Sequence, residues 1–270
     1  MTSPDWLRLF PDADHRMQMN LRRGDAAQFW QRSPQAESIL AERRRWLAQT
    51  PQRYLQILPE GEEAVSEAIT CIRSLQHLPP CPPLQAAGDI EPDWIVLSGD
   101  AARSHPVIGG AVVFPSSWAL EDKIGRPLHD VHAPVPGLQS SMGSQISTFL
   151  TRLVPHVAWE RENWGLSADP ALNHHPANPV RRLDARATLD QTWLRLEQQF
   201  LTRLPDTNAI LFGICVTNHR LDHLAGSPEV AQRLARILAT MSDEFAGYKG
   251  LQTARAPLVA ALTRAGAPGT

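Results

Sequence analysis

The sequence has few cysteines and lacks a long apolar segment. Its three cysteines, Cys71, Cys81 and Cys215, are odd in number and widely spaced, which predicts neither a disulfide framework nor a cysteine-based zinc site. No apolar run approaches the roughly 18 to 20 residues that a membrane span needs, and the first 25 residues lack the apolar core of a signal peptide. We therefore expect a cytoplasmic protein that does not enter a membrane.

An excess of charge of one sign is also lacking. The 26 lysines and arginines are balanced by 28 aspartates and glutamates, so no global field would attract nucleic acid or an anionic lipid surface. Apolar residues form 43% of the chain and charged residues 20%, which is ordinary for a globular protein. We expect one compact domain over residues 1–270 that folds without a partner.

Several motifs of common enzyme classes are absent. The chain contains no GxSxG nucleophile elbow, no P-loop and no GxGxxG dinucleotide fingerprint. A serine hydrolase, an NTPase and a Rossmann-type dehydrogenase are therefore unsupported. An internal repeat is lacking as well, which argues against a solenoid.

The first 90 residues are predicted to be largely helical. Apolar residues at helical spacing indicate helices at 36–49 and 61–76, and the proline-rich stretch 78–92 reads as a connector. Residues 1–35 are expected to be irregular and laid across the main body by apolar anchors such as Trp6, Leu9, Phe10 and Trp30.

The remainder is predicted to form a sheet followed by helices. Runs rich in β-branched residues or with alternating polarity predict strands at 93–98, 107–114, 157–164, 192–200 and 208–216. Helices are expected from a cap at Ser116 or Ser117 to near Gly125, and at 138–154, 227–246 and 255–264. This order favours an α+β fold, a mostly antiparallel sheet with helices on one side.

Two histidines lie in the loop 126–137, RPLHDVHAPVPG, whose three prolines each fix a backbone φ. Because this loop has little freedom to relax, His132 is well placed to offer a nitrogen to a metal ion or a haem iron. A hydrogen-bonded structural histidine is the alternative. His129 is more typical of a solvated turn.

The other histidines do not form a convincing metal site. His174 and His175 are adjacent, and adjacent side chains rarely face one ion. His219 and His223 are four apart, in a polar stretch without the HExxH setting. A hydrolytic metal site is therefore not favoured.

Charged residues recur on the predicted strands. Residues two apart share one strand face, which groups two pairs of polar side chains: Arg161 with Asn163, and Arg195 with Glu197. Solvent exposure is the simpler interpretation. Alternatively, Arg126, Arg195 or Arg203 pairs with a carboxylate such as a haem propionate, for which the bidentate guanidinium is suited.

Four blocks together resemble the alpha subunit of the haem-dependent oxidative N-demethylases. They are FPSSWALEDKIGRPLHDVHAPVPG at 114–137, RENWGL at 161–166, LRLEQQFLTRLPDTNAILFGI at 194–214 and DEFAGYKGL at 243–251. The resemblance covers most of residues 93–265. It implies a PAS-like core over that range that binds haem b.

The resemblance also implies an activity. Such a subunit uses O₂ to hydroxylate the N-methyl carbon of a small secondary amine such as dimethylamine, and the carbinolamine collapses to formaldehyde and the shorter amine. Electrons would come from NADPH through a separate reductase that carries FMN and a [2Fe-2S] centre.

Residue by residue, the resemblance makes His132 the iron ligand. The other matched polar residues are expected to border the same site: Arg126, Arg195 and Arg203 as cofactor contacts, and Asn163 and Glu197 as catalytic residues.

One block departs from the family pattern. A Thr-Ile-Arg-Thr-Tyr-like run is expected where this chain has GICVT at 213–217, and the lost arginine and tyrosine would bear on substrate choice, haem affinity or activity. Two further hypotheses stay open beside the enzyme, and this departure supports the second of them. One is a PAS-like haem- or ligand-binding sensor, which the lack of an appended signalling domain disfavours, and the other is an assembly subunit without haem.

Overall fold

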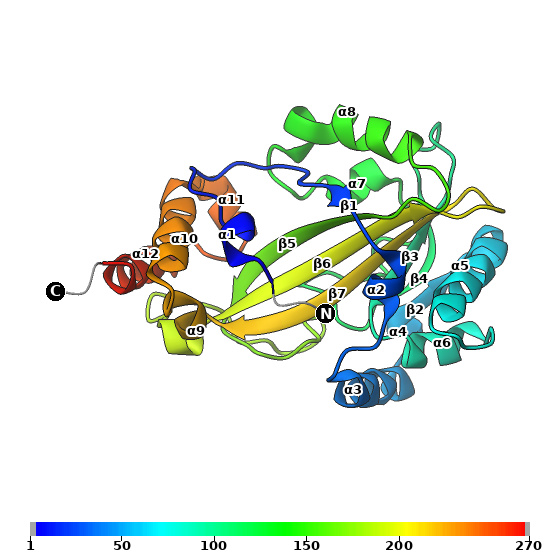
Figure 1. Cartoon of the computed structure of the whole chain (residues 1–270), viewed down its shortest axis with the longest axis horizontal. Helices are drawn as coiled ribbons and strands as arrows, with labels where there is room; N and C mark the ends of the chain where they lie inside the picture. The colour runs from blue at the N-terminus through cyan, green and yellow to red at the C-terminus, as the bar shows by residue number, and fades with distance from the viewer. Residues whose placement is uncertain (1–3, 268–270) are drawn as a thin grey trace.

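One antiparallel sheet of seven strands runs through the molecule (Figure 1). The computed structural model describes residues 4–267. In spatial order the strands are β1 (Arg22–Arg23), β5 (Trp159–Ser167), β6 (Trp193–Arg203), β7 (Ile210–Arg220), β3 (Asp93–Leu97), β4 (Val107–Ala111) and β2 (Leu55–Ile57). Every neighbouring pair is antiparallel, so the predicted α+β class with an antiparallel sheet is confirmed.

Helices stand before, between and after the strands. They are α1 (Trp6–Leu9), α2 (Ala26–Trp30), α3 (Ala36–Gln49), α4 (Pro51–Tyr54), α5 (Glu62–Leu75), α6 (Pro83–Asp89), α7 (Leu128–His132), α8 (Leu138–Thr151), α9 (Leu221–Ala225), α10 (Pro228–Thr240), α11 (Asp243–Tyr248) and α12 (Arg255–Ala265). Two 3₁₀ turns, Pro59–Gly61 and Leu189–Gln191, complete the set for the described range. The longest helices there have 14 residues, and none is long and apolar enough to cross a membrane.

Helices cover both faces of the sheet, so the prediction that they lie on one side is wrong. The register places Trp159 and Gly110 opposite each other across the strands, so both face the same side of the sheet. Gly109 is the neighbour of Gly110 on β4 and therefore faces the other side. Phe149 of α8 packs edge-on against Trp159 with ring centroids 5.4 Å apart. Val65 of α5 closes on Gly109, where an added Cβ would come within 2.6 Å of its Cγ2.

The segment 116–125 contains no α-helix, which corrects the predicted capped helix. The Ser116 hydroxyl donates to a carboxylate on β6 instead of accepting from a helix N–H. Ser117 has a φ of +64°, which does not start a helix, and the last turn closes at Gly125 with a φ of +75°. The helix appears later, as α7, inside the expected loop 126–137.

Two groups of buried apolar side chains pack on the sheet. The larger includes Trp30, Trp94 and Phe200, and the other joins Leu194 to α10 and α12. Because β6 contributes to both groups, the sheet connects them. The single-domain organisation stays a prediction.

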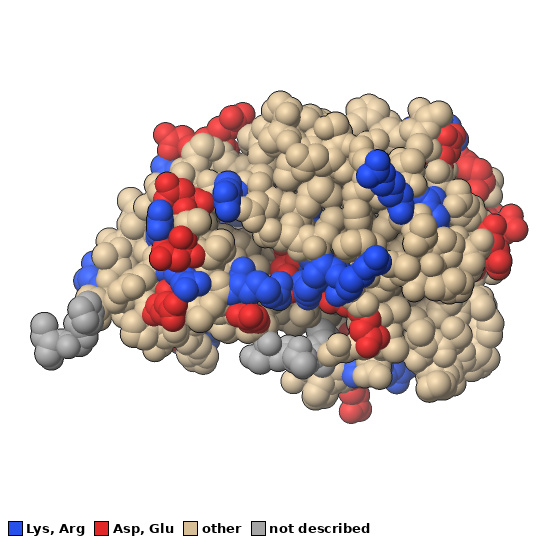
Figure 2. Space-filling view, turned by 45° about the horizontal axis from the view of Figure 1, so that its top comes forward, with Lys and Arg blue, Asp and Glu red and all other residues tan. Residues whose placement is uncertain are grey.

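Charges of both signs are mixed on the surface. Figure 2 shows lysine and arginine side chains interspersed with aspartate and glutamate on one face, without a continuous surface of one sign. On this face, the distribution agrees with the small formal net charge of -2.

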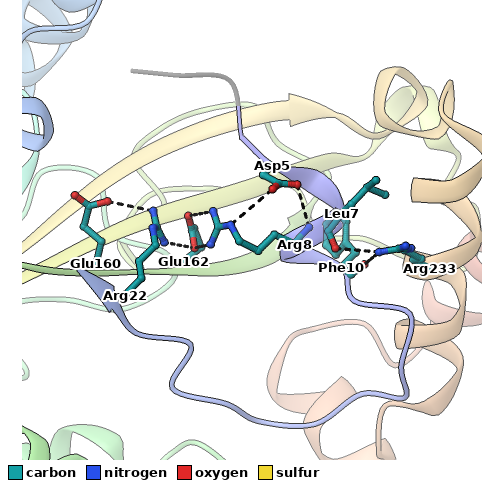
Figure 3. Close-up of polar contacts among 8 residues, drawn as sticks. All are labelled: Asp5, Leu7, Arg8, Phe10, Arg22, Glu160, Glu162 and Arg233. Carbon is teal, nitrogen blue, oxygen red and sulfur yellow. Dashed lines mark hydrogen bonds and ion pairs between the residues drawn. The ribbon is translucent and has the colours of Figure 1, made fainter. Parts of the chain in front are cut away.

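The N-terminal segment crosses the sheet on the face opposite α8, held by ion pairs (Figure 3). Glu162 of β5, whose side chain is 8% exposed, accepts from both Arg8, at 2.7 and 2.9 Å, and Arg22, at 2.8 Å. The predicted anchors Phe10 and Trp30, which belong to this segment, are fully buried. The expectation that this segment lies across the main body is therefore confirmed.

Candidate functional site

Polar side chains gather on the α8 face of strands β5 and β6. The register pairs Asn163 with Glu197 and Arg161 with Gln199, so all four point to the same side as Trp159. We call these four residues, together with Lys249, the polar cluster. The strand alternation thus brings together Asn163 and Glu197, the two predicted catalytic residues.

Glu197 is the buried carboxylate of the polar cluster. It is 8% exposed and accepts three hydrogen bonds, from Ser116 Oγ at 2.5 Å, from Asn163 Nδ2 at 3.2 Å and from Gln199 Nε2 at 2.9 Å. All three donors are neutral. The carboxylate is therefore fixed in place without an ion pair.

Arg195 lies beside Glu197 on β6 and holds two loops against the sheet. Its Nε donates to Ser116 Oγ at 2.7 Å, and its other nitrogens donate to four backbone carbonyls, those of Phe114, Pro115, Ala171 and Leu172. Burial lowers the pKa of this guanidinium to about 10, so it stays charged at neutral pH. Arg195 thus positions Ser116, which in turn positions Glu197.

Lys249 reaches the polar cluster from the end of α11. The predicted helix 227–246 breaks at Met241, and Ser242 caps α11 by accepting from the Phe245 N–H. The Lys249 Nζ donates to Trp164 O at 2.7 Å and lies 3.4 Å from Asn163 Oδ1.

Burial lowers the pKa of the Lys249 amine to about 8. The Glu197 carboxylate opposes this effect and Arg161 adds to it. An amine with such a pKa can exchange a proton near neutral pH.

The guanidinium of Arg161 makes no hydrogen bond in the part of the chain that the structure describes. Its Nε is buried and has no partner within residues 4–267. Burial lowers the pKa of the guanidinium, and the nearby Glu197 and Glu162 carboxylates oppose that shift. A buried polar atom of this kind calls for a partner that the described chain does not supply.

His132 is the last residue of α7 and is half-buried. Burial, together with the charges of Arg161 and Lys123, lowers the pKa of its imidazole to about 4. The ring is therefore neutral at physiological pH, and within the described part of the chain it forms no hydrogen bond. A neutral imidazole nitrogen is the form that ligates iron.

The other two predicted cofactor arginines lie differently. Arg203, at the far end of β6, is eight residues or about 26 Å along an extended strand from Arg195. Its guanidinium donates to the carbonyls of Leu150, Leu153 and Asn208, which joins α8 to the sheet. Arg126 is exposed, and its side chain makes no hydrogen bond within residues 4–267. Their cofactor roles stay predictions.

Neither histidine pair belongs to the polar cluster, although His174 forms a β-bridge with Ser116, the serine that donates to Glu197. His174 and His175 are both buried, and burial lowers the pKa of His174 to about 4. His219 on β7 forms a hydrogen bond of 2.9 Å between its Nε2 and the Thr217 hydroxyl, on the face of the sheet opposite Glu197. His223 is exposed. Among the described residues, no three His, Cys, Asp or Glu side chains gather so as to hold a metal ion.

A groove of about 470 Å³ opens beside the polar cluster, between α8 and β5. Its lining is partly aromatic and partly polar and consists of Ser144, Gln145, Thr148, Phe149, Arg152 and Trp159. Trp159 is two residues from Arg161 on one strand and shares its face. Farther along that face, a Cβ added at Gly165 would meet nothing within 4 Å. This face of β5 thus has open space on both sides of the polar cluster.

The comparison with known protein families bears on this arrangement. The family described as "Haem-dependent oxidative N-demethylase, alpha subunit-like" matches residues 70–259, which is more than half of the chain. The chain belongs to this family. The family name indicates haem dependence and an oxidative reaction, and the predicted resemblance is confirmed. The match includes the whole polar cluster and His132, whereas the N-terminal segment with α1 to α3 lies outside it.

Sequence reasoning gave no functional role to three members of the polar cluster, Arg161, Gln199 and Lys249. Arg161 was expected to face solvent with Asn163, and Lys249 stood in a matched block without a role. A signal was present for Arg161, which is two residues from Asn163, and for Lys249, which lies in the DEFAGYKGL block. What the sequence did not reveal is that α11 turns Lys249 back onto β5.

Proposed function

We propose that this member of the demethylase alpha-subunit-like family is the haem-binding, oxygen-activating subunit of an oxidative N-demethylase. It would remove a methyl group from a small secondary amine such as dimethylamine, with electrons from a partner reductase, in the cytoplasm. The observation that carries the proposal is a neutral His132 imidazole near Arg161, on the face of the sheet that holds Glu197. Among residues 4–267, neither the imidazole nor the guanidinium has a hydrogen-bond partner.

The residues present fit a haem b group. The neutral His132 imidazole would hold the iron, and Arg161 and Lys123, whose charges act on that ring, would meet the propionates. A cysteine ligand fits less well. Burial raises the pKa of the Cys215 thiol to about 12, and Cys215 points to the opposite face of the sheet from Glu197.

When bound, haem supplies the activation of O₂ for hydroxylation of the N-methyl carbon. The chain's own residues would orient the amine and move protons. Glu197, held by three hydrogen bonds, would accept from the N–H of the amine. Loss of formaldehyde from the carbinolamine then needs a proton moved from its hydroxyl to the departing nitrogen. The Lys249 amine, with a pKa of about 8, would exchange that proton, and Asn163 Oδ1 would orient its Nζ.

A separate electron donor fits the composition of the chain. A [2Fe-2S] centre commonly takes four cysteine thiolates, and this sequence has three cysteines. The sequence also lacks a GxGxxG fingerprint, the motif that commonly binds a dinucleotide such as NADPH. We therefore propose that NADPH, FMN and a [2Fe-2S] centre belong to a partner reductase.

The departure at 213–217 does not alter the polar cluster. Cys215 and Thr217 stand where the arginine and tyrosine of the family pattern are expected, and both point to the face opposite Glu197. This favours an active enzyme over an assembly subunit that has lost haem.

Turnover tests the proposal against a sensor. The purified chain is loaded with haem and given dimethylamine, O₂, NADPH and a flavin and iron-sulfur reductase, and formaldehyde and methylamine are measured. We expect the two products in equal amounts, and a loss of at least about tenfold in turnover for Glu197→Gln. A haem-loaded protein that is reduced and yet forms no formaldehyde from any of a series of N-methylamines would support the sensor.

A further inference from the structure

The polar cluster holds more positive charge than it can balance. Arg161 and Lys249 are both cations, and neither forms an ion pair with a carboxylate within residues 4–267. Glu197 is the acidic group that acts on both cations, and Glu162, which acts on Arg161 as well, lies on the opposite face of β5 and is paired with Arg8 and Arg22. One carboxylate therefore faces two cations.

Glu197 is also already committed to other partners. Its oxygens accept from the neutral donors Ser116, Asn163 and Gln199, so it does not bond to either cation. The Lys249 ammonium makes its shortest contact with a backbone carbonyl, that of Trp164. The cluster is thus built around the carboxylate without pairing the cations.

Such an arrangement is costly unless a ligand supplies the missing charge. Buried charged groups are normally paired, and a buried donor without an acceptor costs about 1–3 kcal/mol or more. Burial lowers the pKa of both Arg161 and Lys249, which is the sign of cations that lack compensation. Open space over Gly165 and the groove beside Trp159 leave room on the same strand face.

We propose that Arg161 and Lys249 together bind a carboxylate group of a ligand on the α8 face of β5. The guanidinium offers a flat pair of donors and the ammonium a point charge, a combination suited to a carboxylate. The proposal rests on the proposed function and deepens it.

The carboxylate can come from a haem propionate or from a substrate that is an N-methylated amino acid. In the second case Glu197 would face the amine of the same molecule.

Binding measurements on the full chain separate the two sources. Haem and haem dimethyl ester, in which both propionates are neutral, are titrated by absorbance into the wild type, Arg161→Gln, Arg161→Lys and Lys249→Gln. N-methylglycine and dimethylamine are then titrated by calorimetry into the same proteins, with and without haem. Arg103→Gln, an exposed arginine whose side chain has no hydrogen bond in the described chain, is the matched control.

Each source predicts its own pattern. For a propionate, the wild type binds haem about tenfold or more tighter than the ester, and Arg161→Gln and Lys249→Gln remove the difference. For a substrate carboxylate, haem and ester bind alike, while N-methylglycine binds about tenfold or more tighter than dimethylamine, and the same variants remove that preference. Arg161→Lys keeps the positive charge, so it should retain part of the preference for haem over the ester or for N-methylglycine over dimethylamine.

The proposal is overturned if the wild type shows neither preference, or if Arg161→Gln and Lys249→Gln behave like Arg103→Gln. The calorimetric titration without haem keeps this test separate from the proposed function. A chain that binds N-methylglycine through Arg161 but never binds haem would retain the carboxylate site and refute the haem enzyme. Melting curves identify any variant that fails to fold. If Arg161→Gln or Lys249→Gln fails to fold, the proposal is judged from the ligand preferences of the wild type and of Arg161→Lys.

Discussion

Arg195→Met should destabilise the protein strongly, because the guanidinium ties two loops to β6. The side chain is 4% exposed and serves five acceptors, Ser116 Oγ and four backbone carbonyls. Methionine has similar length and no donors, so these buried acceptors lose their partner. Breaking a buried charged interaction from one side costs about 3–5 kcal/mol.

Calorimetry and urea unfolding provide the assay. For a chain of this size a loss of about 3–5 kcal/mol corresponds to a fall in Tm of roughly 6–20 °C. Arg186→Met is the control, since its side chain is 92% exposed and pairs only with Asp184, and should change stability by less than about 0.5 kcal/mol. A loss below about 1 kcal/mol for Arg195→Met would refute the argument that these hydrogen bonds hold the loops.

Three further predictions follow from the contacts described. Glu162→Gln should cost about 1–2 kcal/mol in urea unfolding, less than a fully buried pair because its two arginines are partly exposed. The pKa of Glu162 is depressed below its usual 4.5, so its contribution is present above that pH and is lost as pH falls through the folded value, and the pH dependence of Tm should show this loss. Carboxylate affinity at the polar cluster should weaken as pH rises through about 8, where the Lys249 amine loses its proton, and Lys249→Arg should abolish that dependence in calorimetric titrations. Gly213→Ala should cost about 1–3 kcal/mol in thermal unfolding, since the new Cβ would lie 2.6 Å from the ring of Phe29.

The sequence predicted the long regular elements well, because their signals are local. Alternating polarity located β5 and β6, and helical spacing located α3 and α5 within a few residues. It missed β1 and β2, which have two and three residues and exist only through pairing with distant strands.

Tertiary contacts overrode local signals in the segment 114–137. Ser116 and Ser117 have the chemistry of helix caps, but the Ser116 hydroxyl is taken by Glu197 and Arg195 from β6. The helix instead starts at Leu128, directly after a proline that is compatible with a helix N-terminus.

The candidate site was only partly accessible from the sequence. Strand alternation and family blocks identified Asn163 and Glu197, whose side chains the register joins. The side chains of Lys249 and Asn163 meet across 86 positions of sequence, which no local pattern encodes.

The most direct test of the central claim is haem binding by the purified chain, compared among the wild type, His132→Ala and His129→Ala. His129 belongs to the same short helix and is exposed, so it controls for damage to α7. The account predicts that the wild type and His129→Ala bind one haem with the same Soret spectrum, whereas His132→Ala stays folded and loses that spectrum. An unchanged Soret band in His132→Ala would remove His132 as the iron ligand, and a wild-type chain that binds no haem would contradict the account as a whole.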